Sequence, residues 1–169
     1  MSRFTKAVLP SLVGAATLLG LAVVPQMAAD QTRTLSNGKQ LGLGLHLYCA
    51  DFDDILPWPQ SIITMKGVTY PYIKNKSIWT TYNPAKSQFL FNSALGGVSM
   101  NSVQDPVGTP LYYESKPWPD GRRIVVYVDG HARIESADAW ATISKKLKGK
   151  WKRAAAKPLP KNHGKDMFR

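Results

Sequence analysis

Residues 35–52 read Leu-Ser-Asn-Gly-Lys-Gln-Leu-Gly-Leu-Gly-Leu-His-Leu-Tyr-Cys-Ala-Asp-Phe, and this stretch decides the fold. The apolar side chains at helical spacing are Leu41, Leu45, Tyr48 and Phe52. They predict one apolar stripe on a helix over about residues 30–55, which we expect to end at Asp53-Asp54 before Pro57. Three glycines in the same stretch each cost about 1 kcal/mol relative to alanine, so this helix needs tertiary support. Glycines on the stripe also allow another backbone to approach closely.

The chain before this helix is apolar and uncharged. Residues 7–29 contain no charged side chain and follow Arg3 and Lys6. The residues that we assign to a membrane or assembly helix are Leu12, Val13, Leu18, Leu19, Leu21, Val23 and Val24. One interpretation is a cleaved signal peptide that ends at Ala28-Ala29, and another is an uncleaved helix of about 20 residues that spans the bilayer. A third is a buried helix of a soluble core. The first two place the chain in the cell envelope, either anchored in the inner membrane or secreted.

The second half of the chain predicts an α+β domain. We expect loops over residues 57–110, which are rich in Pro, Asn, Ser, Gly and Tyr, and a small antiparallel sheet of about three to four strands over 111–135. The predicted strands are 111–114, 124–128 and 131–135. Asp129-Gly130 favours a type I′ hairpin turn between the last two strands. Ser136 is a good N-cap, so a helix is expected to follow it.

The net charge of +11 is concentrated at the carboxyl end. Residues 144–169 contain ten basic side chains and one acidic side chain, whereas residues 30–143 contain ten of each. We therefore divide the chain into a segment 1–29, a domain 30–143 and a basic tail 144–169. The tail is interpreted as a solvated extension, as a basic amphipathic surface for anionic lipid, or as a nucleic-acid contact that stacks a base on Trp151. Export argues against nucleic acid as a partner.

Few residues suggest chemistry. Asp129 and His131 alternate on one strand with Arg133 and are weak candidates for a metal site, although a turn residue and a packed histidine explain them equally. His46 is expected to be a satisfied histidine of the helix, and Cys49 a buried thiol.

Calcium is the one ion that the sequence suggests. The carboxylates of Asp51, Asp53 and Asp54 are suitable oxygen ligands, but their spacing lacks the glycine and distal glutamate of an EF-hand loop. Solvation of the helix end is the other interpretation of these residues. No nucleophile elbow, phosphate loop or His-Glu-x-x-His motif occurs, so we predict no enzyme, no catalytic residue and no cofactor.

The helix stretch, followed by Asp51-Phe-Asp-Asp-Ile-Leu-Pro, resembles the start of the globular part of bacterial pseudopilin-like proteins, which are common in planctomycetes and related phyla. Tyr127-Val-Asp-Gly-His-Ala-Arg is similar to the closing Asp-Gly-His hairpin of that family. The matching positions are Asn37, Lys39, Gln40, Leu41, His46, Tyr48, Asp129, Gly130 and His131. The processing motif departs from the family, because Arg3 and Val8 stand where a glycine and a glutamate are usual.

The resemblance implies a long amino-terminal hydrophobic helix, half of it in the membrane, that continues into a small sheet domain. It also implies a non-enzymatic structural role related to type II secretion or type IV pilus-like systems, with membrane, homo-oligomer or pseudopilus subunits as partners. An alternative function is an exported monomeric binding module that keeps the fold without filament assembly. A further alternative is a polyanion-binding protein that acts through its basic tail.

Overall fold

The computed structural model describes residues 14–58 and 62–153, and side chains from Pro25 onward apart from residues 59–64. The α-helices are α1 (Gly14–Asp51), α2 (Ile62–Ile73) and α3 (Ala137–Ile143). The strands are β1 (Phe89–Phe91), β2 (Pro110–Glu114), β3 (Arg123–Tyr127) and β4 (Ala132–Glu135). The short 3₁₀ helices are η1 (Lys76–Trp79), η2 (Ser93–Leu95), η3 (Met100–Ser102) and η4 (Ser144–Lys148). The predicted α+β class is confirmed.

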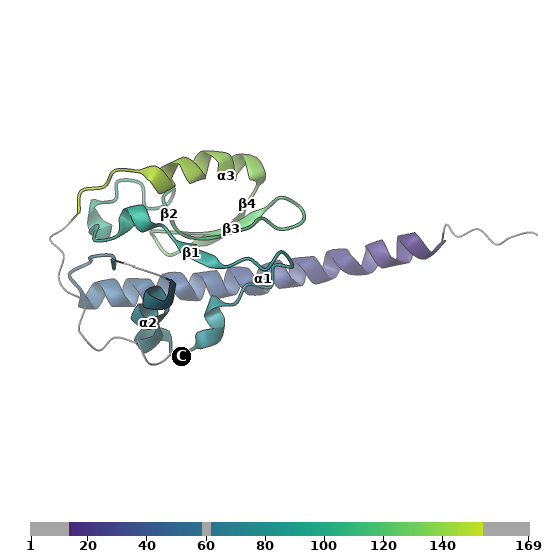
Figure 1. Ribbon diagram of the computed structural model, residues 1–169, viewed down its shortest axis with the longest axis horizontal. Helices are drawn as coiled ribbons and strands as arrows, with labels where there is room; N and C mark the ends of the chain where they lie inside the picture. The colour runs from purple at the N-terminus through teal and green to yellow at the C-terminus, as the bar shows by residue number, and fades with distance from the viewer. Residues whose placement is uncertain (1–13, 59–61, 154–169) are drawn as a thin grey trace, which may run out of the picture.

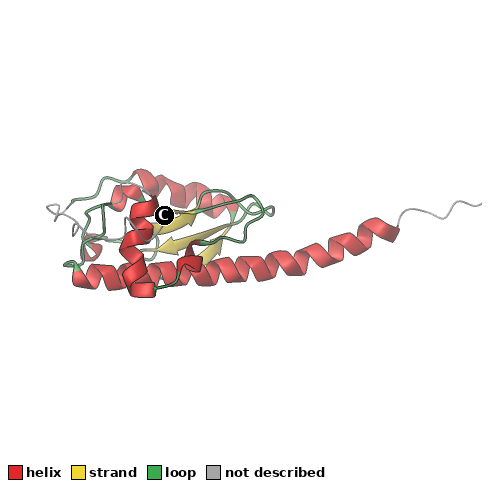
Figure 2. Ribbon diagram, turned by 60° about the horizontal axis from the view of Figure 1, so that its bottom comes forward, coloured by secondary structure: helices red, strands yellow, loops and turns green. Residues whose placement is uncertain are grey.

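The four strands form one antiparallel sheet in the order β1-β2-β3-β4. Figure 1 shows the sheet between α1 and α3, with α2 packed next to α1. Figure 2 shows the strands lying along the second half of α1. Neighbouring residues of β2 serve opposite faces: Tyr112 packs edge-on against Trp79, whereas Tyr113 contacts Trp140 of α3. The main core therefore lies between the sheet and α1.

Helix α1 runs without interruption across the predicted boundary at residue 29 and ends at Asp51. It ends there because Asp53 and Asp54 have φ values of 55° and 58°, which a right-handed helix does not allow. The Asp54 amide donates to the Cys49 carbonyl at 2.8 Å and closes the last turn. The predicted helix end at the two aspartates is confirmed.

The predicted apolar stripe is the part of α1 that enters the core. Leu41 and Leu45 are fully buried and Tyr48 is nearly so. Phe52, just past the helix, is half-buried and stacks on Tyr48 with 4.3 Å between ring centroids. All four positions therefore face the sheet or α2, as the helical spacing predicts.

The segment 57–110 differs from the predicted loop region, because it contains α2 and β1 as well as three 3₁₀ helices. Gly67 and Pro71 disfavour a helix locally, but Met65 and Val68 are buried against α1 and stabilise α2. Strand β1 has three residues, too few to show a period of two along the sequence. Tertiary packing therefore decides both elements.

The β3–β4 hairpin does not have the predicted type I′ turn. A type I′ turn needs two residues with positive φ, and only Gly130, with φ of +89°, has one here. The Gly130 amide donates to the Tyr127 carbonyl at 2.9 Å, and the Tyr127 amide donates to the His131 carbonyl at 2.8 Å. The loop therefore has three residues, a turn followed by a left-handed glycine, and the last strand starts at Ala132 instead of His131.

The carboxyl side of the domain begins as predicted. The Ser136 hydroxyl accepts from the Ala139 amide at 3.1 Å and caps α3. The chain beyond α3 does not leave the body at residue 143, because Arg153 forms a β-bridge with Val98. Residues 144–153 thus lie on the globular body, whereas residues 154–169 are outside the described residues.

The long amino-terminal helix is confirmed, but its hydrophobic character is not shown. Within the described part of the chain, no helix is long and apolar enough to cross a membrane. Of the assigned membrane or assembly residues, Leu12 and Val13 lie outside the described residues. The other five, Leu18, Leu19, Leu21, Val23 and Val24, belong to α1, but their side chains are also outside the described residues.

Candidate functional site

His46 and Gly130, two of the positions that carry the family resemblance, meet where α1 packs against the β3–β4 hairpin, and we call this contact the helix–hairpin seam (Gly42, His46, Val126, Val128 and Gly130). A Cβ atom on Gly42 would lie 3.0 Å from the Gly130 carbonyl oxygen, so the two backbones touch here. His46 Nε2 donates to the Val128 carbonyl at 2.8 Å. The predicted close approach and the predicted satisfied histidine are both confirmed.

The polar side chains of the hairpin bind one another. His131 Nδ1 lies 2.5 Å from Asp129 Oδ1, and the imidazole stacks on the Tyr127 ring with 4.4 Å between centroids. The Tyr127 hydroxyl donates to Glu135 at 2.6 Å. Burial, together with this hydrogen bond, raises the pKa of Tyr127 above its ordinary range. His131 therefore packs on the hairpin, and Arg133 is exposed beside it.

Asp129 and His131 supply two ligands, fewer than the three or four protein ligands that a zinc site uses. Among the described residues, no group of three or more His, Cys, Asp or Glu side chains is placed to hold a metal ion. The candidate calcium ligands have other contacts: Asp51 accepts from the Tyr72 hydroxyl at 2.8 Å, and Asp54 accepts from Asn101 at 2.8 Å. These aspartates tie the end of α1 to the chain around it.

Cys49 is a structural thiol. It is 1% exposed, and burial, with a smaller effect of Asp54, raises its pKa to about 12. A thiol with this pKa is protonated at neutral pH and is a poor nucleophile. The prediction of a buried cysteine is confirmed.

The remaining motif positions of α1 have structural contacts. Asn37 donates to the carbonyls of Ser77 and Thr80, at 3.3 and 2.9 Å, and so fastens η1 to the helix. Leu41 and Tyr48 are core residues, as described above. Lys39 is exposed and Gln40 is half-buried.

One polar network connects α1 to the loop between β2 and β3, and nothing in the sequence predicted it. Gln31 is 2% exposed and donates to Asp120 at 2.9 Å, while Arg122 donates to Gln31 at 2.9 Å and to Asp120 at 2.8 Å. Burial alone raises the pKa of Asp120, but the hydrogen bonds from Arg122 and Gln31 outweigh it and lower that pKa. The only local signal is the pair Asp120-Gly121, whose residue types favour a turn but indicate no partner for the Asp120 carboxylate.

A buried carboxylate is the second feature that the sequence analysis missed. Glu114 is fully buried and accepts from Trp118 Nε1 at 2.6 Å, from the Ile124 amide at 3.0 Å and from Asn83 at 3.3 Å. Burial raises its pKa despite these three donors. A glutamate at a strand end carries no sequence signal for such a network, because its partners lie in other segments.

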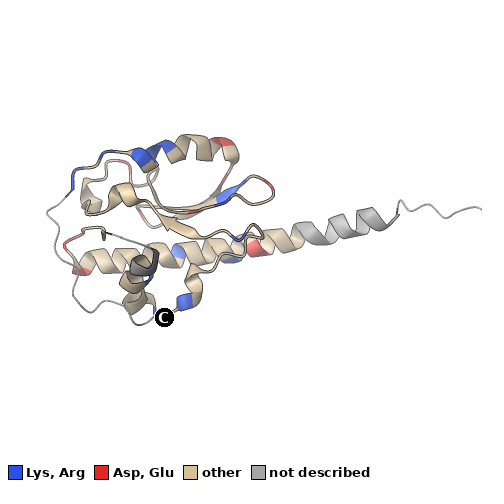
Figure 3. Ribbon diagram, in the orientation of Figure 1, with Lys and Arg blue, Asp and Glu red and all other residues tan. Residues whose placement is uncertain are grey.

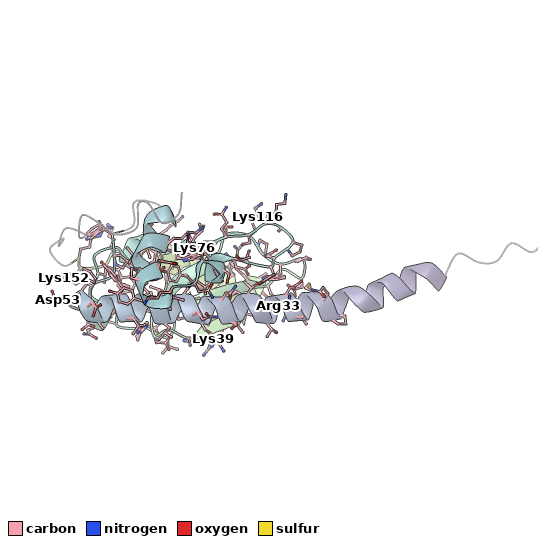
Figure 4. All side chains as sticks on the ribbon, turned by 90° about the horizontal axis from the view of Figure 1, so that it is seen from below. Arg33, Lys39, Asp53, Lys76, Lys116 and Lys152 are labelled. Carbon is pink, nitrogen blue, oxygen red and sulfur yellow. The ribbon has the colours of Figure 1, made fainter. Side chains whose placement is uncertain are left out.

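The outer face of α1 remains open along the body. Leu43 and Leu47, four residues apart on this face, are 56% and 42% exposed. Figure 4 shows Arg33 and Lys39 on the same helix, nearer to its amino end. The described part of the chain thus offers exposed helix surface for contacts along the body.

Comparison of the chain with protein-family models, with curated proteins and with solved structures gives no match.

Proposed function

We propose that this chain is a non-enzymatic, pseudopilin-like protein of the cell envelope that acts through contacts of α1. The observation that carries the proposal is the extension of α1 beyond the globular body (Figure 1). Pro25, Gln26, Ala28 and Ala29 are exposed on this helix, and its first buried side chain among the described ones is Gln31. A helix that leaves its domain in this way has a surface that only another molecule or a membrane covers.

The sequence of the extension supports an apolar environment. Residues 7–29 carry no charge, and apolar area removed from water contributes about 25 cal/mol per Å². A bilayer or a bundle of α1 helices from other copies removes this area from water. The proposed partners are therefore the inner membrane and further pilin-like subunits, in a role related to type II secretion or type IV pilus-like systems.

A second candidate function, an exported monomeric binding module, is favoured by the place where burial begins. Cleavage after Ala29 would leave Gln31 and its bonds to Asp120 and Arg122 intact. The helix would then keep the buried stripe that packs against the sheet. Such a chain keeps the fold and loses the segment that assembly needs.

Amino-terminal sequencing and intact mass of the protein from its native envelope separate the two candidates. A mature start at Phe4, or an unprocessed chain that fractionates with membranes, is the result expected for the proposal. A start at Asp30 in the soluble exported fraction supports the binding module instead. An unprocessed chain in the cytosol overturns both.

A pair of variants tests the role of the extension directly. Leu18→Lys with Leu21→Lys should move the protein from the membrane fraction to the soluble fraction, since a charge at the centre of a membrane helix costs about 3 kcal/mol. Leu43→Lys with Leu47→Lys is the matched control, because these leucines are already exposed on α1 beside the body. Equal membrane partition of the two variants would contradict the proposal.

A further inference from the structure

More than half of the net positive charge of this protein falls within ten residues. Residues 30–143 contain as many acidic as basic side chains, whereas residues 144–153 contain six basic side chains and no acidic one. We call residues 144–153 the basic strap. Figure 3 shows Lys and Arg following one another along the chain after α3, at the end of the body where α1 also ends.

The basic strap is held on the body at both ends. Lys146 Nζ donates to Asp105 at 2.6 Å and to the Gly108 carbonyl at 2.8 Å. At the other end, Arg153 forms its β-bridge with Val98, and its guanidinium lies 4.5 Å above the centre of the Trp58 ring. The strap therefore has a defined course over the surface.

Between these anchors, the side chains alternate. Lys148, Lys150 and Lys152 are exposed, whereas Gly149 and Trp151 are half-buried, and Trp151 packs against the core. Lys148 ends η4, and Lys150 and Lys152 stand on either side of Trp151 in the chain that follows. Three exposed lysines thus follow one another along the basic strap in a row, and Trp151 anchors the backbone between them.

The basic strap lies at the far end of α1. Val98, its bridge partner, accepts from the Leu56 amide at 2.9 Å, and Leu56 follows the end of α1 by only five residues. Figure 4 shows Lys152 and Asp53 at the same end of the molecule. Because α1 has 38 residues and rises about 1.5 Å per residue, its first residue lies about 57 Å from this end. A membrane that holds the start of α1 is therefore not the surface that the strap meets.

We propose that the basic strap is a binding surface for a linear, flexible polyanion that carries phosphate or carboxylate groups. A row of cations matches a chain of anions better than it matches a flat surface, and binding is driven by the counterions that the polymer releases. Exposed lysines keep their hydration until they bind, so the contact depends strongly on salt. This function is separate from the proposed role of α1, because the two surfaces lie at opposite ends of the helix.

Calorimetric titration of the full chain with inorganic polyphosphate, at several salt concentrations, tests the proposal. The strap variant replaces four exposed lysines by glutamine, at Lys145, Lys148, Lys150 and Lys152. The matched control replaces four exposed lysines elsewhere, at Lys39, Lys74, Lys86 and Lys116, and so has the same net charge. We expect the strap variant to bind at least about tenfold more weakly than the control, with a salt slope lower by about 0.7 for each lysine removed.

Poly-glutamate in a parallel titration shows whether the strap prefers phosphate or carboxylate groups. A smaller variant, Lys150→Gln with Lys152→Gln, repeats the test with two substitutions in place of four. Failure of the wild type to bind either polymer overturns the proposal, as does equal loss in the strap variant and the control. Tighter binding to phosphatidylglycerol vesicles or to duplex DNA than to both polymers also overturns it. None of these results depends on the membrane partition of α1.

Discussion

Gly42 stands where α1 and the β3–β4 hairpin come closest. A Cβ atom there would lie 3.0 Å from the Gly130 carbonyl oxygen and 3.1 Å from Cγ1 of Val126. The oxygen belongs to a turn that is held by hydrogen bonds between Tyr127 and the backbone of Gly130 and His131. Glycine at position 42 lowers the helix propensity of α1, but it allows the helix and the β3–β4 hairpin to come into contact.

Replacing Gly42 by valine should lower the free energy of unfolding by about 1–3 kcal/mol, because the added atoms overpack the contact between α1 and Gly130. Urea denaturation measures this loss. Leu43→Val is the matched control, since it places the same residue on the exposed face of the same helix, where the expected change is within about 0.5 kcal/mol. Equal losses in the two variants would show that the close contact has no energetic importance.

At the scale of elements, Glu114 joins three segments that are distant in sequence. Its carboxylate binds Asn83 before β1, Trp118 in the loop after β2, and the backbone of Ile124 in β3. The Arg123 side chain donates to the Glu114 carbonyl and adds a contact between the same two strands. One buried acid therefore holds the wide β2–β3 connection on the sheet.

Glu114→Gln should destabilise the protein by about 1–3 kcal/mol, because an amide NH₂ would replace one of the two carboxylate oxygens. The N–H groups that now donate to that oxygen would then face another donor. The loss should depend on pH. Burial raises the folded-state pKa of Glu114 above its ordinary 4.5. Protonated Glu114 therefore contributes its full stability below pH 4.5, and this contribution is lost as the pH rises through the folded-state pKa. The stability difference between wild type and variant should therefore shrink as the pH rises above the ordinary 4.5.

Unfolding in urea at a series of pH values tests this expectation. Glu135→Gln is the control, because Glu135 is half-buried at the edge of the sheet. A difference between wild type and Glu114→Gln that grows with pH, or one that follows the control, would contradict the assignment.

The described part of the molecule is a layered body of α1, the sheet and α3, and the basic strap packs on this body near the carboxyl end of α1. Lys146 crosses to the loop at Asp105 and Gly108, and Arg153 reaches Val98 beside the end of α1. Through these contacts, the described part of the body extends ten residues beyond the end of α3.

A chain that ends at Ile143 should be less stable than a chain that ends at Arg153 by about 1–3 kcal/mol, since it loses the partly buried Trp151 and the bonds of Lys146 and Arg153. Thermal and urea unfolding of the two truncated proteins compare them directly. Equal unfolding midpoints would mean that the strap lies on the body without stabilising it.

Local patterns predicted much of the domain. The stripe of Leu41, Leu45 and Tyr48, the helix end at the two aspartates and the Ser136 cap were all readable from nearby residues. Each depends on interactions within one or two helical turns, which spacing and side-chain type report directly. The same holds for β2, β3 and β4, whose β-branched and aromatic residues favour extended backbone.

The amino-acid sequence by itself thus determined the α+β class, the helix that carries the apolar stripe and the hairpin-rich half, because periodicity and capping are local properties. Only the tertiary structure decided that α2 and β1 form within residues 57–110, that Gly42 meets Gly130, and that the strap folds back. These features depend on contacts between residues far apart in the chain, and such contacts leave no period in the sequence that contains them.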